Sequence, residues 1–242
     1  MSDSRPKTIL ITGCSAGGIG AALALRLADQ GHRVFATARD TRKIPSHVRE
    51  HRKVTALALD VTDDVSVAAA SIAAFSDLLI ASRGRVVNIG AAVGCLYSPW
   101  IGAYSSSKSA LHTVSETLRM ELQPFGVTVA CLVTGTVATR FHANEGEFSL
   151  PAGSLYADIL RTISRWARGE LGPDQGSVDD YVTQILPDVL GNSRGGKLWR
   201  GANAGAAWFA SCWLPDYVLD KLVVLNQGLD KLTQSILEKK AD

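Results

Sequence analysis

This chain lacks any long apolar run and any strong excess of charge of one sign. Its 242 residues carry 25 Lys and Arg against 23 Asp and Glu, a net charge of +2, with no basic stripe that would favour nucleic acid. No uninterrupted apolar stretch approaches the roughly 20 residues of a membrane span, and residues 1–7 lack the apolar core of a signal peptide. A composition that is 46% apolar gives no sign of disorder and favours one α/β domain over 1–242.

Cysteine is also scarce. The four cysteines lack the spacing of metal ligands or of a disulfide framework, and they are Cys14, Cys95, Cys131 and Cys212. We therefore expect reduced thiols, no metal site and a cytoplasmic location.

The most apolar stretch, 204–214, contains Trp208, Phe209 and Trp213 and ends at Pro215. An aromatic segment of this kind predicts a peripheral contact with a membrane surface or lipid droplet. A subunit contact or the wall of a substrate pocket is the alternative interpretation.

Strand-like and helix-like segments alternate along the chain. Short apolar runs predict strands at 8–12, 34–38, 54–59, 86–89, 127–133 and 197–199. Helical spacing predicts helices at 19–30, 63–81 and 103–122, with one or two more within 134–195. Such alternation without repeats predicts an α/β fold with a doubly wound, Rossmann-like parallel sheet of six strands.

A glycine-rich turn, Thr12-Gly-Cys-Ser-Ala-Gly-Gly-Ile-Gly20, joins the first strand to the first helix. Glycines there let the backbone approach a pyrophosphate, and the helix N-terminus supplies N–H groups and a positive dipole end. The predicted cofactor contacts in this turn are Gly13, Gly18, Ile19 and Gly20.

The same turn contains Gly13-Cys-Ser15-Ala-Gly17, the nucleophile-elbow pattern of esterases, with His112 and His142 available as bases. Because an esterase elbow normally follows several strands and this one follows the first, we favour the dinucleotide interpretation.

The residues at the end of the second predicted strand indicate whether the dinucleotide is NAD or NADP. A carboxylate there would bind a free ribose 2′-hydroxyl, whereas this chain has Arg39, followed by Arg42 and Lys43. Cations at this place favour the 2′-phosphate of NADP. Asp60, just past the third strand, is predicted to reach the adenine edge; capping of the next helix is its alternative role.

Tyr104 and Lys108 are four residues apart at the start of a predicted helix and so share one of its faces. A neighbouring cation favours phenolate and brings a phenol of pKa near 10 toward the working range. The pair predicts proton transfer in carbonyl and alcohol chemistry. A second copy of the spacing, Tyr217 and Lys221, follows Pro215 in the apolar tail and is interpreted as packing or interface.

Taken together, these segments resemble the short-chain dehydrogenase/reductase family and are most similar to the fungal branch that includes NADPH-dependent 1-acyldihydroxyacetone-phosphate reductases. The likeness covers nearly the whole chain and rests on the glycine turn, Asp60-Val61, Val87-Asn-Ile-Gly90, Tyr104 to Lys108 and Gly201-Ala-Asn-Ala-Gly205. It implies that Tyr104 exchanges the proton with the substrate oxygen, that Lys108 binds the nicotinamide ribose, and that Val137 and Thr139 contact the nicotinamide carboxamide.

The sequence departs from the family pattern at two places. The family has a substrate-binding serine thirteen residues before the tyrosine, where this chain has Ala91, whose methyl group cannot donate. The family also has a further strand and helix between Asp60 and Asn88, where this chain has only 27 residues. We therefore expect one central strand to be missing and 86–89 to pair directly with 8–12, with 63–81 as a single crossover helix. An incomplete gene translation is the alternative explanation.

The function expected from these observations is an NADP-dependent oxidoreductase that interconverts a carbonyl and a secondary alcohol on a small, apolar, lipid-like or secondary-metabolite substrate. The alternative is a redox-impaired descendant that binds cofactor or substrate without efficient turnover. We expect a substrate lid over about 139–195, an apolar tail over 201–242, and assembly as a homo-oligomer.

Overall fold

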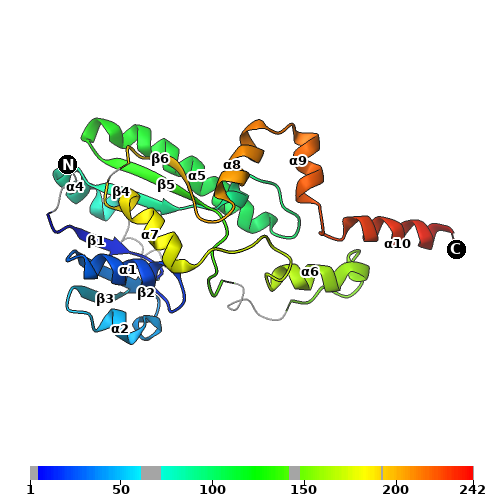
Figure 1. Ribbon diagram of the computed structural model, residues 1–242, viewed down its shortest axis with the longest axis horizontal. Helices are drawn as coiled ribbons and strands as arrows, with labels where there is room; N and C mark the ends of the chain where they lie inside the picture. Colours follow the sequence, from blue (N-terminus) through cyan, green and yellow to red (C-terminus); the bar gives the residue numbers. More distant parts are fainter. Residues whose placement is uncertain (1–4, 61–71, 142–147, 192, 242) are drawn as a thin grey trace.

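The computed structural model describes residues 5–60, 72–141, 148–191 and 193–241, in which parallel strands are flanked by helices (Figure 1). The strands of the first sheet run in the order β1-β2-β3, and they are β1 (Thr8–Ile11), β2 (Arg33–Ala38) and β3 (Val54–Ala58). The strands of the second sheet run in the order β4-β5-β6, and they are β4 (Arg85–Ile89), β5 (Thr128–Thr134) and β6 (Gly196–Arg200). The predicted Rossmann-like α/β fold is confirmed, with fewer strands than the family's usual seven.

The helices follow the strands in the expected alternation. Their bounds are α1 (Ile19–Asp29), α2 (Ser46–Arg49), α4 (Ile72–Ser82), α5 (Gly102–Leu122), α6 (Leu160–Ala167), α7 (Val178–Val189), α8 (Ala204–Trp213), α9 (Asp216–Val223) and α10 (Leu229–Ala241). Local signals set several of these ends. Ser177 caps α7 by accepting a hydrogen bond from the backbone N–H of Asp180 at 3.0 Å.

One hydrophobic core serves both sheets. It joins buried side chains of β1 and β2 to Leu132 of β5, with Leu27 of α1 and Ile185 of α7 packed among them. Helices α1 and α7 lie side by side in front of the sheets (Figure 1). The two helices therefore hold the two sheets together by apolar burial.

The predicted pairing of 86–89 with 8–12 is wrong. In the described residues β1 pairs with β2 and β4 pairs with β5, so the six strands form two sheets of three. Both strands are instead held at the end of α7, where Lys7 Nζ, before β1, donates to Leu190 O at 2.7 Å and Arg85 of β4 donates to Asp188 O at 2.9 Å. Part of the predicted crossover helix, 63–81, is α4, and its first half lies outside the described residues.

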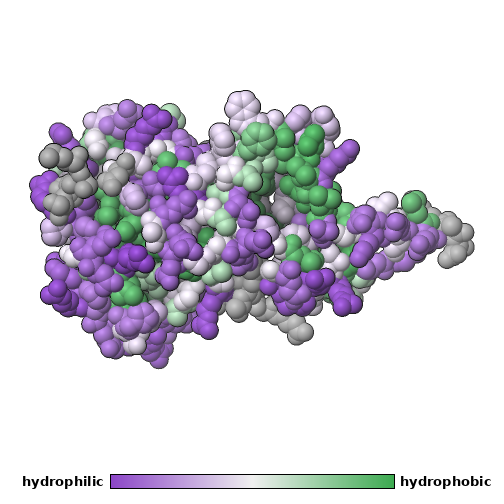
Figure 2. Space-filling view, in the orientation of Figure 1, coloured by the Kyte–Doolittle hydropathy of each residue, from purple (hydrophilic) through white to green (hydrophobic). Residues whose placement is uncertain are grey.

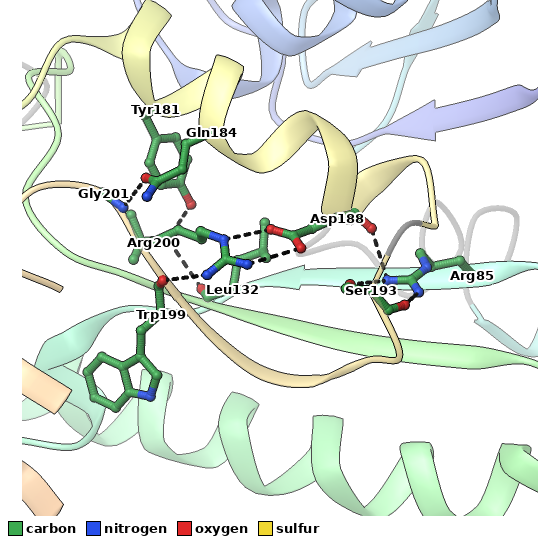
Figure 3. A network of polar contacts seen from close by, with 10 residues as sticks. Arg85, Leu132, Tyr181, Gln184, Asp188, Ser193, Trp199, Arg200 and Gly201 are labelled. Atoms are coloured by element: carbon green, nitrogen blue, oxygen red, sulfur yellow. Dashed lines mark hydrogen bonds and ion pairs between the residues drawn. The ribbon is translucent and has the colours of Figure 1, made fainter. Parts of the chain in front are cut away.

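Helix α7 is fixed to the second sheet by a polar network (Figure 3). The buried carboxylate of Asp188 binds the Arg200 guanidinium at 2.7 and 3.2 Å. The Tyr181 hydroxyl lies 2.6 Å from the Thr134 hydroxyl, which donates to Leu132 O. Desolvation raises the pKa of Tyr181 to about 12, so this phenol stays neutral.

The apolar tail folds into α8 and α9, and α10 extends away from the body of the molecule (Figure 1). Apolar surface covers part of α8 and α9 (Figure 2). The aromatic side chains of Trp208, Phe209 and Trp213 on α8 are exposed. Among the described helices, none combines the length and apolar character that crossing a bilayer requires. The membrane contact and the homo-oligomer stay predictions.

Candidate functional site

The glycine turn has the backbone geometry that its sequence predicts. Gly13 and Gly17 have φ of 73° and 75°, in the left-handed region that favours glycine. A Cβ on Gly20 would lie 2.6 Å from the carbonyl oxygen of Gly13, so glycine is required where α1 meets the turn. The N-cap, Gly18, offers no side chain, which leaves the first N–H groups of α1 without a side-chain partner.

Two backbone hydrogen bonds tie this turn to the carboxyl end of β2. Cys14 N donates to Thr37 O at 2.8 Å, and Ala16 N donates to Lys43 O at 2.9 Å. Ile19, one of the predicted cofactor contacts, is partly buried against the core. The turn and the basic segment after β2 therefore form one continuous surface.

The esterase interpretation finds no support in the described residues. Burial raises the pKa of the Cys14 thiol to about 11, and its Sγ lies 3.4 Å from Ile11 O. Ser15 is exposed, whereas His112 lies in the second half of the fold, bonded to the backbone of Ala91. His142 lies outside the described residues. No group of three metal-ligating side chains occurs in the described segments either.

The basic residues after β2 differ in whether they form ion pairs. Arg42 pairs with Asp40 at 2.9 Å, and Asp40 also caps the short 3-10 helix Thr41–Lys43. Arg39 is exposed at the end of β2 and has no ion pair with any other described residue. Asp60 follows β3, where Leu59 N donates to Ala38 O at 3.0 Å, so the carboxylate and Arg39 lie at ends of neighbouring strands.

Tyr104 and Lys108 share a face of α5, as the spacing predicts. The Lys108 ammonium lies 5.7 Å from the centre of the Tyr104 ring and donates to the Ile89 carbonyl of β4 at 3.0 Å. Burial raises the pKa of the Tyr104 phenol and lowers the pKa of Lys108. The phenol pKa thus moves opposite to the expected direction, because burial of the phenol disfavours its charged form.

Around the loop after β4, the structure brings together residues whose mutual contacts the sequence did not predict. Ala91 N donates to His112 Nε2 at 3.3 Å, and Cys95 Sγ lies 3.5 Å from His112 Nδ1. One turn further along α5, Ser115 Oγ accepts from Asn88 Nδ2 at 2.9 Å. The signal was present in the spacing, since positions 104, 108, 112 and 115 recur every three or four residues on one helical face.

The segment after β5 connects the glycine turn to the phenol. Arg140 N donates to Gly17 O at 3.4 Å, and the Arg140 side chain lies where a Cβ on Gly17 would be. The ring of the next residue, Phe141, lies 5.3 Å from the ring of Tyr104. The carboxyl ends of strands from both sheets therefore meet in one site.

The two other predicted contacts in this segment differ in surroundings. Val137 is partly buried against the core and forms a bridge with Gly176. The Thr139 hydroxyl accepts from Phe141 N at 3.3 Å, which fixes the direction of the Phe141 ring's approach to Tyr104.

A hollow of about 570 Å³ lies beside the turn of α5 that carries Tyr104. Its walls combine apolar and hydroxyl side chains from three elements, including Leu96, Tyr97, Pro99, Ser105, Val223 and Val224. Part of the predicted lid packs elsewhere: Ile159 and Ile163 form a small core with Leu232 of α10. Described residues of that lid therefore contribute none of the hollow's walls.

Comparison with known sequences matches this chain to the family model for short chain dehydrogenases over residues 7–79 and 66–149. A short-chain dehydrogenase of Penicillium ochrochloron is 35% identical over 272 aligned positions, with 92% of this chain and 98% of the relative covered. Since 92% of 242 residues is about 223, about 49 of the 272 positions face a gap in this chain. The gap and the two-part family match agree with the predicted absence of an internal segment.

Two more distant proteins share the architecture. An NADPH-dependent 1-acyldihydroxyacetone phosphate reductase of Schizosaccharomyces pombe is 28% identical, with 84% of this chain and 85% of the relative covered. A solved short chain dehydrogenase of Burkholderia cenocepacia, in complex with NADP, superposes with a TM-score of 0.69 at 18% identity, covering 91% of this chain and 98% of that one.

Proposed function

We propose that this chain, which belongs to the short-chain dehydrogenase family, is an NADP-dependent oxidoreductase acting on a carbonyl or secondary alcohol. The proposal rests on the contacts that two consecutive residues, Arg140 and Phe141, make with two parts of the site. Arg140 contacts Gly17 of the glycine turn, and Phe141 contacts the ring of Tyr104. A dinucleotide whose phosphates lie on the turn would therefore have its nicotinamide end near the phenol.

The residues present fit a dinucleotide. Gly13 leaves open space where a Cβ would be, and the N-terminus of α1 presents backbone N–H groups to a pyrophosphate. Lys108 has donors beyond the one bonded to Ile89 O, so it can also bind a ribose hydroxyl. When bound, the cofactor supplies or accepts the hydride.

NADP is favoured over NAD by the charge at the end of β2. Arg39 is exposed and has no ion pair among the described residues, whereas Arg42 is held by Asp40. A free guanidinium at this position suits a 2′-phosphate, which it can bind through two parallel hydrogen bonds.

Tyr104 is the proposed proton donor to a carbonyl oxygen in the reduction direction. At neutral pH this phenol is protonated and can donate to a carbonyl oxygen, and the burial that raises its pKa makes it a weaker acid than a free phenol.

The hollow beside α5 supports an apolar substrate. Its volume of about 570 Å³ lies within the range of small-molecule sites, roughly 300–1,000 Å³. Leu96 and Pro99 provide one apolar wall, and Val223 and Val224 of α9 provide the other. We infer that this hollow receives an apolar part of the substrate that lies away from the carbonyl, because Tyr104 is not among the residues that line it.

The alternative function is cofactor binding without efficient turnover. It is favoured by Ala91, which offers a methyl group where the family resemblance implies a serine donor. Removing one preorganised donor to a developing oxyanion typically costs on the order of 10²–10³ in rate.

Binding and turnover measured separately distinguish the two functions. We expect wild-type protein to bind NADPH more tightly than NADH, seen as energy transfer from tryptophan to the reduced nicotinamide, and to oxidise NADPH with an apolar ketone. Tyr104→Phe should keep NADPH affinity and lose at least about 100-fold in turnover, because proton transfer typically contributes 10²–10⁴.

The matched control is Tyr217→Phe, since Tyr217 belongs to the second Tyr-Lys pair and is 67% exposed on α9. It should change neither quantity. NADPH binding without oxidation of any ketone would support the alternative function, and absence of NADPH binding would contradict both.

A further inference from the structure

Two neighbouring side chains of α5 hold the end of β4. Lys108 donates to the carbonyl of Ile89, and one turn later His112 accepts from the N–H of Ala91. The two contacts lie on the same face of the helix and on backbone groups two residues apart. Any movement of the β4 end relative to α5 therefore changes both.

The loop is built around the imidazole ring of His112, which is 2% exposed. A Cβ on Gly90 would collide with His112 Nε2, and a Cβ on Gly94 would lie 2.7 Å from His112 Cε1. Both glycines have negative φ, so no turn conformation requires them. At Gly90 the ring of His112 is the nearest obstacle to a side chain, and at Gly94 a side chain is excluded both by the ring and by the backbone of Lys108 at 2.9 Å.

The hydrogen bonds define the state of the ring. Because Ala91 N–H donates to Nε2, that nitrogen carries no proton, and the proton of a neutral ring is on Nδ1. Nδ1 faces Cys95 Sγ at 3.5 Å, a weak acceptor. Burial first, then the positive charges of Lys197 and Lys108, lower the pKa of His112, which keeps the ring neutral.

We propose that His112 is a positioning residue for Lys108 and Tyr104. By accepting from Ala91 N–H it fixes the β4 end, which presents the Ile89 carbonyl to Lys108 and so determines where the ammonium lies relative to the phenol and the cofactor ribose. The catalytic consequence rests on the proposed function. The structural part, the hydrogen bond from Ala91 to His112, does not.

Protonation of His112 would break this arrangement. A proton on Nε2 turns the acceptor into a donor that faces the N–H of Ala91. The charges that act on the ring are those of Lys108 on α5 and Lys197 on β6. The Cys95 thiol faces Nδ1, and the Cys131 thiol, which the carboxylate of Glu116 on α5 influences, lies near the ring at Gly90. The cations oppose protonation, and burial raises the pKa of Cys95 and Cys131, so these thiols remain neutral while His112 titrates.

Two substitutions separate the acceptor from the volume of the ring. His112→Gln keeps an acceptor that does not titrate, and His112→Phe keeps a ring without an acceptor. We measure hydrogen–deuterium exchange of the Ala91 amide, and kcat and KM for NADPH-dependent ketone reduction between pH 5 and 8. His112→Phe should speed Ala91 exchange and lower kcat about tenfold or more, because a buried N–H loses its partner.

His112→Gln should stay close to wild type in Ala91 exchange and in kcat at neutral pH. Below pH 6.5, the ordinary pKa of histidine, kcat should decline less in His112→Gln than in wild type. Matched controls are His47→Gln and His47→Phe on α2, where the side chain is exposed.

Equal values for the Gln and Phe variants, or an acid decline that persists unchanged in His112→Gln, would overturn the proposal. If His112→Phe does not fold, the pH profile of His112→Gln still decides. If wild-type protein binds no NADPH, the proposed function fails by itself, and the exchange rate of Ala91 in His112→Gln against wild type at pH 5.5 decides the positioning role.

Discussion

Ala91 is 9% exposed, and its N–H is bonded to His112, so the backbone of this residue is fixed although its side chain is only a methyl group. A serine at this position would take over a backbone that is already held in place. At this position the departure from the family pattern is therefore a single hydroxyl on a backbone that is already held.

The substitution Ala91→Ser tests this statement. We expect it to raise kcat for ketone reduction, by up to about 10²–10³ if the new hydroxyl reaches the oxyanion, while NADPH affinity stays unchanged. Steady-state kinetics and cofactor titration provide both numbers. The control is Ala92→Ser, an equally buried neighbour at the start of the 3-10 helix Ala92–Gly94. A similar gain in both variants would argue against a role for position 91.

Single residues also show what the sequence could predict about the site. Helical spacing placed Tyr104 and Lys108 on one face of α5, and the glycine turn has the expected left-handed glycines. The direction of the Tyr104 pKa was not predicted, because the burial that raises it depends on how the chain packs around α5. His112 was named only as a possible esterase base, and its hydrogen bond with Ala91, 21 residues away, was missed.

At the scale of elements, α7 depends on charge as well as on apolar packing. The Asp188 side chain is 6% exposed and the Arg200 side chain 29% exposed, and they form a two-point ion pair between α7 and β6 (Figure 3). A buried carboxylate without its partner is costly, so Arg200 is the member of the pair whose loss should matter more.

Truncating Arg200 to alanine should therefore destabilise the fold. We expect Arg200→Ala to lower the free energy of unfolding by about 3 kcal/mol, the lower end of values for breaking buried pairs, as measured by urea unfolding. Arg168→Ala is the matched control, because Arg168 pairs with Glu170 on the exposed surface and such pairs contribute little. Comparable losses in the two variants would show that the Asp188 carboxylate gains enough solvation without its partner.

Elements were predictable where the sequence pattern is local. Apolar runs flanked by glycine gave β1, β2 and β5, and helical periodicity gave α1 and α5. The stretch before β6 carries a similar signal, since apolar residues at 178, 181, 182 and 185 follow helical spacing after the N-cap Ser177. Only a range, 134–195, was predicted for this helix, whose Tyr181, Val182 and Ile185 reach the shared core.

For the molecule as a whole, two buried histidines link stability to pH. His32 accepts from Lys7 N at 3.1 Å, His112 accepts from Ala91 N, and burial lowers the pKa of both. Below the unfolded value of 6.5, the unfolded chain binds protons that the folded chain excludes. Stability from these two groups is therefore complete above pH 6.5 and is lost as the pH falls.

We expect the free energy of unfolding to decrease between pH 6.5 and 5, by at most about 1.4 kcal/mol per pH unit for each histidine. Urea unfolding at several pH values measures the slope, and the double variant His32→Gln/His112→Gln should flatten it. This window lies above the ordinary carboxyl pKa values of about 4, so Asp and Glu contribute little to it. An unchanged slope in the double variant would assign the effect to other groups.

The arrangement of the two sheets was the least predictable feature. Counting strands showed that one was missing, but which elements then join β1 to β4 depends on Lys7 and Arg85 reaching the end of α7. These contacts span 183 and 103 residues of sequence. Strand order across such a separation is a property of the packed chain.

The step from Arg140 to Phe141 has a consequence for ligand entry. One peptide unit carries the contact with the turn at Gly17 on one side and with the aromatic ring of Tyr104 on the other. A nucleotide that spans these two places must part that junction, so the free energy of parting it is subtracted from the affinity. Occupancy and the separation of the tilted Phe141 and Tyr104 rings become a single event, which the ultraviolet absorbance of Tyr104 would report.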